Sequence, residues 1–232
     1  MASSNESLES TNRVEPVLAH LPVSRLTNYG KGQVIYNPYD LPTHLYRVVT
    51  GLVGISQIAG EGRQILLEIV RPDELFGESA FAGAPGRSQR ATALQDAEVM
   101  AWTVSDMELL VLERPRLGVA LLQLLAQRNA EFTRRIESLS IDSIDRRLAR
   151  SLLRFSERLG APEEDGAVRM MPFTHEMLSR YVGTSREIVT LYMNRFRKRG
   201  YVSYSRDGIR VYGDTLKTWL DGSGYPSSET PS

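Results

Sequence analysis

The chain has 232 residues, a hydrophobic fraction of 41%, and 28 Lys and Arg balanced by 28 Asp and Glu, which suits two folded domains with ordinary cores. The absence of cysteine excludes disulfides, thiolate zinc sites, cysteine-ligated iron–sulfur clusters and a cysteine nucleophile. Because no apolar run is long enough to span a membrane and the first residues lack a signal-peptide pattern, we expect a soluble, cytoplasmic protein.

The first half of the chain is predicted to be a β-rich sensor domain. Residues 1–13 are polar without periodicity and are expected to form a disordered leader. Over residues 14–114, a short helix from Val14 to Leu21 precedes many short alternating runs, which are separated by Gly, Pro and Asn turn signals. The clearest runs are Val34–Tyr36, Leu45–Val49 and Val53–Ile55. We therefore expect a roll or barrel closed by hairpins.

Residues 115–142 are predicted to form one long helix. Residues at steps of three and four place a stripe along it, consisting of Leu121, Leu125, Arg128, Phe132, Ile136 and Leu139. One interpretation packs this stripe against the chain's own β-domain. The other, which we favour, pairs it with a second copy in a two-stranded seam, because the stripe is narrow and the motif that follows requires a dimer.

The second domain is predicted over residues 143–221. It opens with a helix over Ser143–Leu159, a turn-rich connection over Gly160–Gly166 and a short strand over Val168–Met171. Residues 222–232, which are rich in Gly, Ser and Pro, are expected to form a flexible tail.

Two short helices joined by a glycine follow this strand. Thr174 is a good N-cap for the first helix, and Gly183 can take the left-handed conformation that a tight interhelical turn requires. Thr184 is expected to cap the second helix, with Glu187 three residues later completing a capping box. This pattern predicts a helix-turn-helix.

A hairpin and a concentration of positive charge follow the second short helix. Asp207-Gly208 is a strong hairpin signal between two alternating runs, Tyr201–Tyr204 and Ile209–Tyr212. Between Ser185 and Arg206 the basic residues are Arg186, Arg195, Arg197, Lys198, Arg199 and Arg206, whereas only Glu187 is acidic. A winged helix-turn-helix with a basic second helix favours DNA binding over the alternative, a helical hairpin with a solvated basic face.

The segment Thr174–Tyr212, with Gly183-Thr-Ser-Arg-Glu-Ile-Val189 at its centre, resembles the DNA-binding domain of the cyclic-AMP receptor protein and fumarate–nitrate regulator (CRP/FNR) family. The resemblance extends from about Leu21 to Tyr212. It implies an α+β fold with an N-terminal cyclic-nucleotide-binding-like β-roll, a long dimerisation helix and a C-terminal winged helix-turn-helix. It also implies a transcription regulator rather than an enzyme, which binds a palindrome of double-stranded DNA as a homodimer and has RNA polymerase as a further partner.

The resemblance implies DNA contacts residue by residue. Arg186 would donate two hydrogen bonds to a guanine, and Glu187 would accept from a cytosine amino group or serve only as a capping carboxylate. His175 matches a phosphate-contacting position, with a solvated first-turn residue as the alternative. Leu191 stands where the family has a third polar reader, so the usual half-site is in doubt there. The candidate DNA-binding residues are Thr174, His175, Ser185, Arg186, Glu187, Thr190 and Leu191.

Phe76-Gly-Glu-Ser-Ala80 followed by Gly86-Arg-Ser88 resembles the phosphate-binding cassette of the cyclic-nucleotide-binding roll. Arg87 would neutralise the cyclic phosphate, and Glu78 would accept from the ribose 2′-hydroxyl. The alternative is a β-bend glycine beside a surface Glu–Arg pair. The sequence departs from the family at Gln89, where a small residue is usual, and at Phe132, one of two positions that carry hydroxyls. The candidate ligand-binding residues are Gly77, Glu78, Ser79, Arg87, Ser88 and Thr133.

These residues lead to the hypothesis that cyclic AMP or a related cyclic nucleotide, bound between the roll and the long helix, controls DNA binding allosterically. The alternative is a family member with a vestigial pocket or a different small-molecule effector. No metal site is expected, because His20, His44 and His175 are too scattered to chelate. The lack of cysteine argues against an iron–sulfur cluster, and His44 alone is a poor candidate for the axial ligand of a haem.

Overall fold

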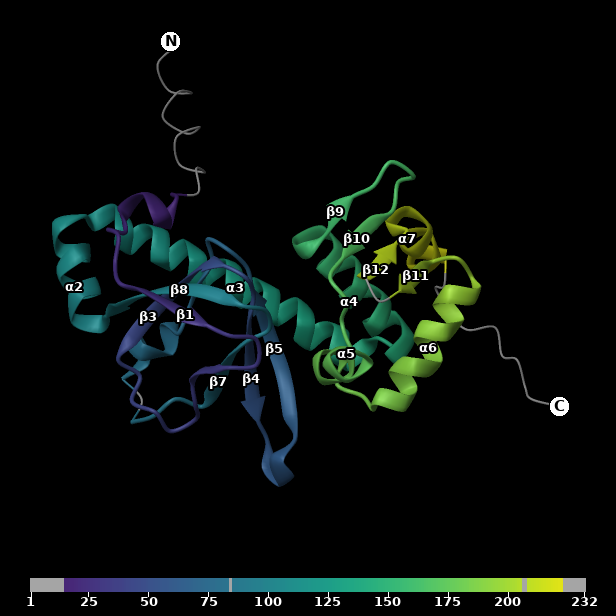
Figure 1. Cartoon of the computed structure of the whole chain (residues 1–232), viewed down its shortest axis with the longest axis horizontal. Coiled ribbons are helices and arrows are strands. Elements are labelled where there is room, and N and C mark those ends of the chain that lie inside the picture. Colours follow the sequence, from purple (N-terminus) through teal and green to yellow (C-terminus); the bar gives the residue numbers. More distant parts are fainter. Residues whose placement is uncertain (1–14, 84, 206–207, 223–232) are drawn as a thin grey trace, which may run out of the picture. The chain divides into compact units, whose positions relative to one another are not determined.

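The structure, a computed structural model, describes residues 15–83, 85–205 and 208–222. The predicted leader, the hairpin residues Arg206 and Asp207, and all of the predicted tail except Gly222 lie outside the described residues. The chain divides into two compact units, one formed by Met1–Ile58 with Glu68–Arg135 and the other by Ala59–Leu67 with Ile136–Ser232 (Figure 1). None of the helices in the described ranges has the length and apolar character needed to cross a lipid bilayer.

The first half of the chain is built from short strands, as the alternating runs predict. Its elements are η2 (Val17–His20), β1 (Leu26–Tyr29), β2 (Val34–Tyr36), β3 (His44–Thr50), β4 (Val53–Ile58), η3 (Gly60–Gly62), β5 (Gln64–Val70), β6 (Leu75–Phe76), η4 (Glu78–Ala82), β7 (Gln89–Ala93) and β8 (Ala97–Thr103). Two four-stranded sheets have the orders β1-β8-β3-β6 and β2-β7-β4-β5. The pairs β3–β8 and β4–β7 are antiparallel. This arrangement is the expected β-roll.

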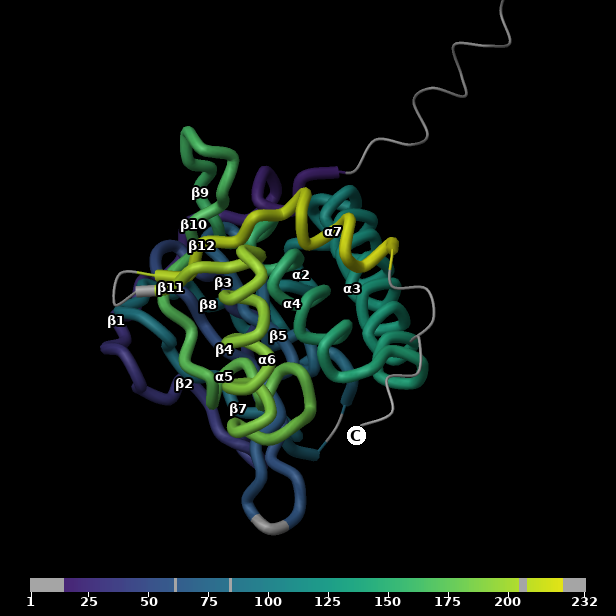
Figure 2. The backbone as a smooth tube through the Cα atoms, turned by 90° about the vertical axis from the view of Figure 1, so that its right-hand side faces the viewer, coloured from purple at the N-terminus to yellow at the C-terminus, as the bar shows by residue number. Residues whose placement is uncertain are grey.

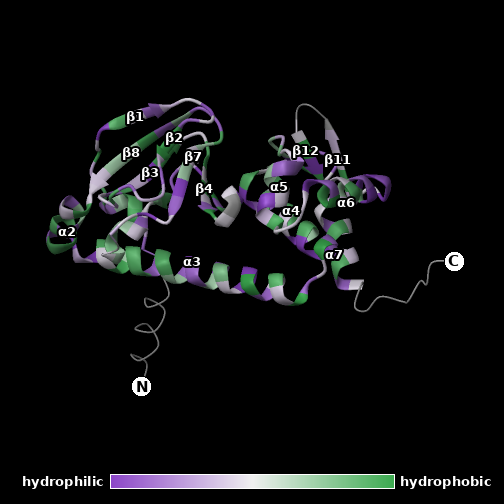
Figure 3. Cartoon of the chain, turned by 90° about the horizontal axis from the view of Figure 1, so that it is seen from below, coloured by the Kyte–Doolittle hydropathy of each residue, from purple (hydrophilic) through white to green (hydrophobic). Residues whose placement is uncertain are grey.

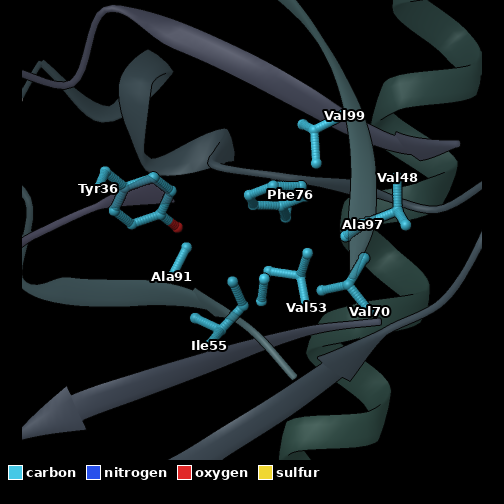
Figure 4. Close-up of a cluster of buried hydrophobic side chains, with 10 residues drawn as sticks. Tyr36, Val48, Val53, Ile55, Val70, Phe76, Ala91, Ala97 and Val99 are labelled. Carbon is cyan, nitrogen blue, oxygen red and sulfur yellow. The ribbon is translucent and has the colours of Figure 1, made fainter. Parts of the chain in front are cut away.

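Buried side chains from both sheets form the core of the roll (Figure 4). Val53 and Val70 are fully buried, and Phe76 is 1% exposed. Phe76 stacks on Tyr46 with ring centroids 5.0 Å apart. Burial of such side chains contributes roughly 1.5–3 kcal/mol each. The core thereby holds the end of β6 in place, and the segment that begins at Gly77 follows directly.

Two helices follow the roll. Helix α2 (Val104–Glu113) was not predicted, although its start carries a capping box between Thr103 and Asp106. Helix α3 (Pro115–Ile141) is the predicted long helix. Leu117 of α3 is fully buried in a second cluster with Trp102.

The predicted stripe on α3 separates into two faces. Leu121 packs against the second cluster and Arg128 is buried, so these two residues face the roll. The exposed apolar side chains on the other face are Leu122, Leu125, Phe132, Ile136 and Leu139. Figure 3 shows hydrophobic positions recurring along the whole helix. Four of the six residues of the predicted stripe are therefore exposed, whereas Leu121 and Arg128 face the roll. The spacing alone does not tell which side of the helix meets the roll.

The second unit contains the helix-turn-helix and a small sheet. Its elements are α4 (Ile144–Leu159), β9 (Ala161–Pro162), β10 (Val168–Met170), α5 (His175–Val182), α6 (Arg186–Lys198), β11 (Val202–Ser205), β12 (Gly208–Val211) and α7 (Gly213–Gly222). The sheet has the order β11-β12-β10-β9, and Figure 2 shows its strands beside α6. Helix α7 was not predicted; its Trp219 packs on Phe196 of α6, with ring centroids 5.5 Å apart. Gly222, assigned to the flexible tail, instead ends this helix.

Candidate DNA-binding helix and ligand pocket

The turn between α5 and α6 is set by local capping. The Thr174 hydroxyl accepts a hydrogen bond from the Met177 N–H at 3.0 Å, and Gly183 has φ = 76°, so both predictions are confirmed. The predicted Thr184 cap is wrong: Ser185 is the N-cap of α6 and accepts from the Ile188 N–H at 3.4 Å. A capping box needs Glu or Gln three residues after the cap. Since Ile188 holds that position, Glu187 does not complete one.

Helix α6 presents a polar face opposite a buried one. Val189, Met193 and Phe196 are buried in the unit. Arg186 and Glu187 are exposed, and Leu191 is 48% exposed. Arg186 forms no ion pair within the described residues, so its guanidinium fork is free for a bidentate acceptor.

The carboxylate of Glu187 is held in its charged form. A hydrogen bond from its own backbone N–H lowers its pKa, and the Ser185 hydroxyl and the charge of Arg186 lower it further. An ionised carboxylate can only accept hydrogen bonds. Glu187 therefore has the chemistry to meet a cytosine amino group, and it also stabilises the first turn of α6.

A chain of hydrogen bonds links α5 to α6. The Thr190 hydroxyl donates to the Arg186 carbonyl at 2.9 Å, and the Nδ1 of His175 lies 2.8 Å from the same hydroxyl. Because the hydroxyl has a single proton, the Nδ1 of His175 must be the donor. The neutral ring then has a lone pair on Nε2. Burial lowers the pKa of His175, and the charge of Arg186 lowers it further.

In the first unit, Gly77 lies where only glycine fits. Its φ is 86°, and a Cβ at this position would lie 2.8 Å from the Cδ2 of Tyr46 and 3.1 Å from the His44 carbonyl oxygen. Glycine therefore permits the sharp bend from β6 into η4. The bend brings the Gly77 carbonyl and the Ser79 hydroxyl to the guanidinium of Arg87.

Arg87 is buried inside the roll, with 2% of its surface exposed. Its guanidinium donates to the His44 carbonyl at 2.8 Å and to the Gly77 carbonyl and the Ser79 hydroxyl, both at 3.3 Å. Its guanidinium carbon lies 4.1 Å from the centroid of the Tyr36 ring. Burial raises the pKa of Tyr36, so the ring stays neutral and offers its face to the cation.

The charge of Arg87 has no carboxylate partner among the described residues. The neighbouring Glu78 is instead paired with Arg128 of α3, whose Nη1 lies 2.7 Å from the Glu78 Oε2. Arg128 also donates to the Leu75 carbonyl and lies 3.8 Å from a Glu68 oxygen. The sequence placed Arg128 in the helix stripe without a role in the pocket. Because a buried arginine needs an acidic partner, the position of Arg128 within an apolar stripe could have indicated such a pair from the sequence.

The remaining candidate ligand residues are more dispersed. Ser88 is exposed, and the Thr133 hydroxyl donates to the Asn129 carbonyl at 3.0 Å rather than to a residue of the roll. Thr133 follows Arg128 by five positions, which turns it about 140° around α3 from that arginine. The structure thus joins Gly77, Ser79 and Arg87 in one cluster, with Glu78 paired beside it; Ser88 and Thr133 are not part of this cluster. In the described part of the chain, no group of acidic and histidine side chains is arranged to hold a metal ion.

Comparisons with known proteins identify both domains. Residues 26–114 match the cyclic nucleotide-binding domain and residues 146–212 the Crp-like helix-turn-helix domain. The transcriptional regulator SdrP of Thermus thermophilus is 36% identical over 78% of this chain and 86% of its own length. The CRP-like cAMP-activated global transcriptional regulator of Mycobacterium tuberculosis is 27% identical over 79% of this chain and 82% of its own length.

A solved structure leads to the same assignment. A CRP/FNR-family transcriptional regulator from Thermus thermophilus superposes with a TM-score of 0.72 at 31% identity, covering 86% of this chain and all of the other. Members of this family regulate transcription and are not enzymes. The two matched domains, the relatives and the fold together show that the chain belongs to the CRP/FNR family of DNA-binding transcriptional regulators.

Proposed function

We propose that this regulator is a homodimer whose β-roll binds a cyclic nucleotide, with cyclic AMP favoured, and that the nucleotide controls DNA binding allosterically. The observation that carries this proposal is the buried guanidinium of Arg87, which has no carboxylate partner among the described residues. A buried charge without a counter-charge is costly, and an anionic ligand removes that cost. The sensor role belongs to residues 14–114 and the DNA-binding role to residues 143–221.

The chemistry of the cluster suits a cyclic phosphodiester, which carries one negative charge. Within the described ranges, Arg87 donates to two carbonyl oxygens and a hydroxyl, so these dipoles solvate its charge without neutralising it. The Ser79 hydroxyl is next to it, and Ser88 follows in the chain with an exposed side chain. Glu78, held by Arg128, can still accept from a sugar hydroxyl through its free lone pairs. The mycobacterial relative is named as cAMP-activated, which supports the same effector.

The exposed apolar face of α3 supports the dimer. Leu122, Leu125, Phe132, Ile136 and Leu139 follow the spacing of a two-stranded coiled coil, with Asn129 completing the pattern. A monomer would leave this stripe in water. A single Asn in such a seam favours parallel, in-register pairing at some cost in stability.

Thr133 supplies a route by which the ligand could act on the seam. Because it is turned about 140° from Arg128, it lies on the seam side of α3. A nucleotide held by Arg87 of one protomer would then meet Thr133 of the partner subunit. Such a ligand contacts both helices, so it stabilises one arrangement of the seam over another, which is the differential contact that allostery requires.

The seam would in turn set the spacing of the two α6 helices. They must lie about 34 Å apart, one DNA turn, to enter successive major grooves of a palindrome. Arg186 and Glu187 would then read bases, while Thr174, His175, Ser185 and Thr190 line the backbone side and Leu191 meets a thymine methyl. The site of action would be the cytoplasm, with RNA polymerase as a further partner.

Calorimetric titration of the full chain with cyclic AMP and cyclic GMP tests the proposal. We expect saturable nucleotide binding that Arg87→Met weakens by roughly 100-fold, and tighter binding to a selected DNA palindrome when the nucleotide is present. Absence of heat and of saturation with both nucleotides, measured on a folded dimer, would refute the cyclic-nucleotide assignment.

In a second candidate function, the chain still regulates transcription, but its pocket is vestigial or binds a different small-molecule effector. Phe132 and Gln89 replace residues that the family uses near the ligand, and the base side of the pocket keeps only the Thr133 hydroxyl. If Arg87→Met leaves DNA binding unchanged both with and without nucleotide, an effector of another kind or a vestigial pocket is favoured.

A further inference from the structure

The wing contributes a side chain that organises the exposed face of α6. Tyr204 lies on β11, and its hydroxyl donates to the Oδ1 of Asn194 at 3.0 Å. Its ring meets the edge of the His175 ring, with centroids 5.9 Å apart. The guanidinium carbon of Arg197 lies over the same ring, 5.3 Å from its centroid. Tyr204 thus joins the wing to both helices of the motif.

Arg197 lies on the same side of α6 as the predicted base reader. It follows Arg186 by eleven residues, which brings it to within about 20° of Arg186 around the helix. Arg195 follows Arg186 by nine residues and lies about 180° away, which places it about 40° from Leu191. Arg195 also stacks on a tyrosine, with its guanidinium carbon 5.3 Å from the Tyr192 ring centroid, but this tyrosine belongs to α6 itself. Of the two arginines, only Arg197 therefore stacks on the wing.

We propose that Arg197 is a DNA phosphate contact that the Tyr204 ring of the wing holds in position. This inference rests on the proposed insertion of α6 into the major groove. Phosphates line that groove, so an exposed cation beside the inserted face of α6 meets them.

The geometry leaves the binding edge of Arg197 available. Stacking uses the flat face of a guanidinium, and its N–H groups point outward in the plane. Arg197 is exposed and forms no ion pair within the described residues. Because Tyr204 is itself tied to Asn194, the stack limits the freedom of a long side chain, and less conformational entropy is lost on binding.

Salt-dependent DNA binding by the full chain tests this inference. A fluorescently labelled duplex of random sequence serves as the probe, because phosphate contacts do not depend on base sequence. Arg197→Ala should lower the slope of log affinity against log salt by about 0.9, the value for one phosphate contact on duplex DNA. Arg25→Ala, which removes an exposed arginine from the first unit, is the matched control and should leave the slope unchanged.

Two variants of Tyr204 distinguish the contribution of its ring from that of its hydroxyl. Tyr204→Phe keeps the stacking face and should retain the wild-type slope, whereas Tyr204→Leu should lose part of it. If Tyr204→Leu fails to fold, judged by its thermal melt, the comparison of Arg197→Ala with Arg25→Ala still decides. Equal slopes for these two variants would overturn the inference while leaving DNA binding intact. A wild-type protein that binds no duplex even at low salt would instead overturn the proposed use of α6.

Discussion

The β-roll and the winged helix use arginine in opposite ways. In the roll, Arg87 is 2% exposed, surrounded by carbonyls and aromatic rings, and has no carboxylate among the described residues. In the winged helix, Arg186 and Arg197 are exposed on one face of α6. The first arrangement suits one small anion that fits a closed site, and the second suits an extended polyanion.

The difference has an energetic consequence. The roll has already removed water from its cation on folding, so the gain from binding an anion is large and only weakly screened by salt. The exposed cations of α6 exchange counterions for phosphates, so their contribution falls steeply as salt rises. The affinity of the roll for its ligand should therefore depend little on ionic strength, whereas the affinity of the winged helix for DNA should depend on it strongly.

The largest effect is expected at the seam, which would couple the two regions. Ile136→Arg places a charge in the exposed apolar stripe and should produce monomers, lowering specific DNA affinity by roughly 100-fold or more because the two half-sites no longer bind together. Ala130→Arg adds the same charge on another exposed face of α3 and should remain dimeric. Light scattering and a gel shift measure both; a dimeric Ile136→Arg would contradict the seam.

The next effect is expected in the roll. Arg87→Met removes the buried cation and should weaken cyclic-nucleotide binding by roughly 100-fold, since loss of a buried charged partner costs about 2–5 kcal/mol. Arg90→Met, three residues later on β7, is the control: Arg90 donates to the Asn37 side chain at 3.1 Å on the exposed surface. Calorimetry at low and high salt also tests the weak screening of this site. Equal affinity for the two variants would contradict the role of Arg87.

A smaller and more selective effect is expected for the exposed face of α6. Arg186→Ala should cost about 1–3 kcal/mol on a selected palindrome and relax specificity at one base pair, because a bidentate guanine contact is lost. Arg197→Ala should instead weaken all sequences about equally. Selection from a random DNA pool with each variant distinguishes the two roles. Unchanged base preference in Arg186→Ala would show that the Arg186 side chain contacts only the DNA backbone.

The smallest effect is expected for the pH dependence of DNA binding. Burial keeps the pKa of His175 below its ordinary value, so the ring is neutral at pH 7 with its proton on Nδ1. A phosphate contact through Nε2 needs a second proton. DNA binding would then take up a proton, so affinity should rise a few-fold as the pH falls from about 8 to about 6 and should decline as the pH rises. Anisotropy titrations should show this trend lost in His175→Gln, and an equal trend in that variant would assign it elsewhere.

Much of the architecture followed from local patterns. The β-rich texture predicted the roll, and the Thr174 cap and the Gly183 turn predicted the helix-turn-helix because each depends on residues a few positions apart. Local signals were ambiguous where two neighbouring residues could each act as the N-cap of a helix. Thr184 and Ser185 are both good caps, and only the backbone conformation selected Ser185. Helices α2 and α7 were not predicted. The packing of Trp219 of α7 on Phe196 is a tertiary contact that the sequence does not show.

The sequence by itself determined which residue types were available: a basic second helix, a Gly-Glu bend, an arginine ten residues after Gly77, and an apolar helix stripe. Only the tertiary structure decided how they are used. Arg87 is buried without a carboxylate partner among the described residues, Glu78 is paired with Arg128 of α3, and Arg197 stacks on Tyr204 of the wing. The physical reason is that desolvation and charge pairing depend on neighbours in space, and those neighbours lie far apart along the chain.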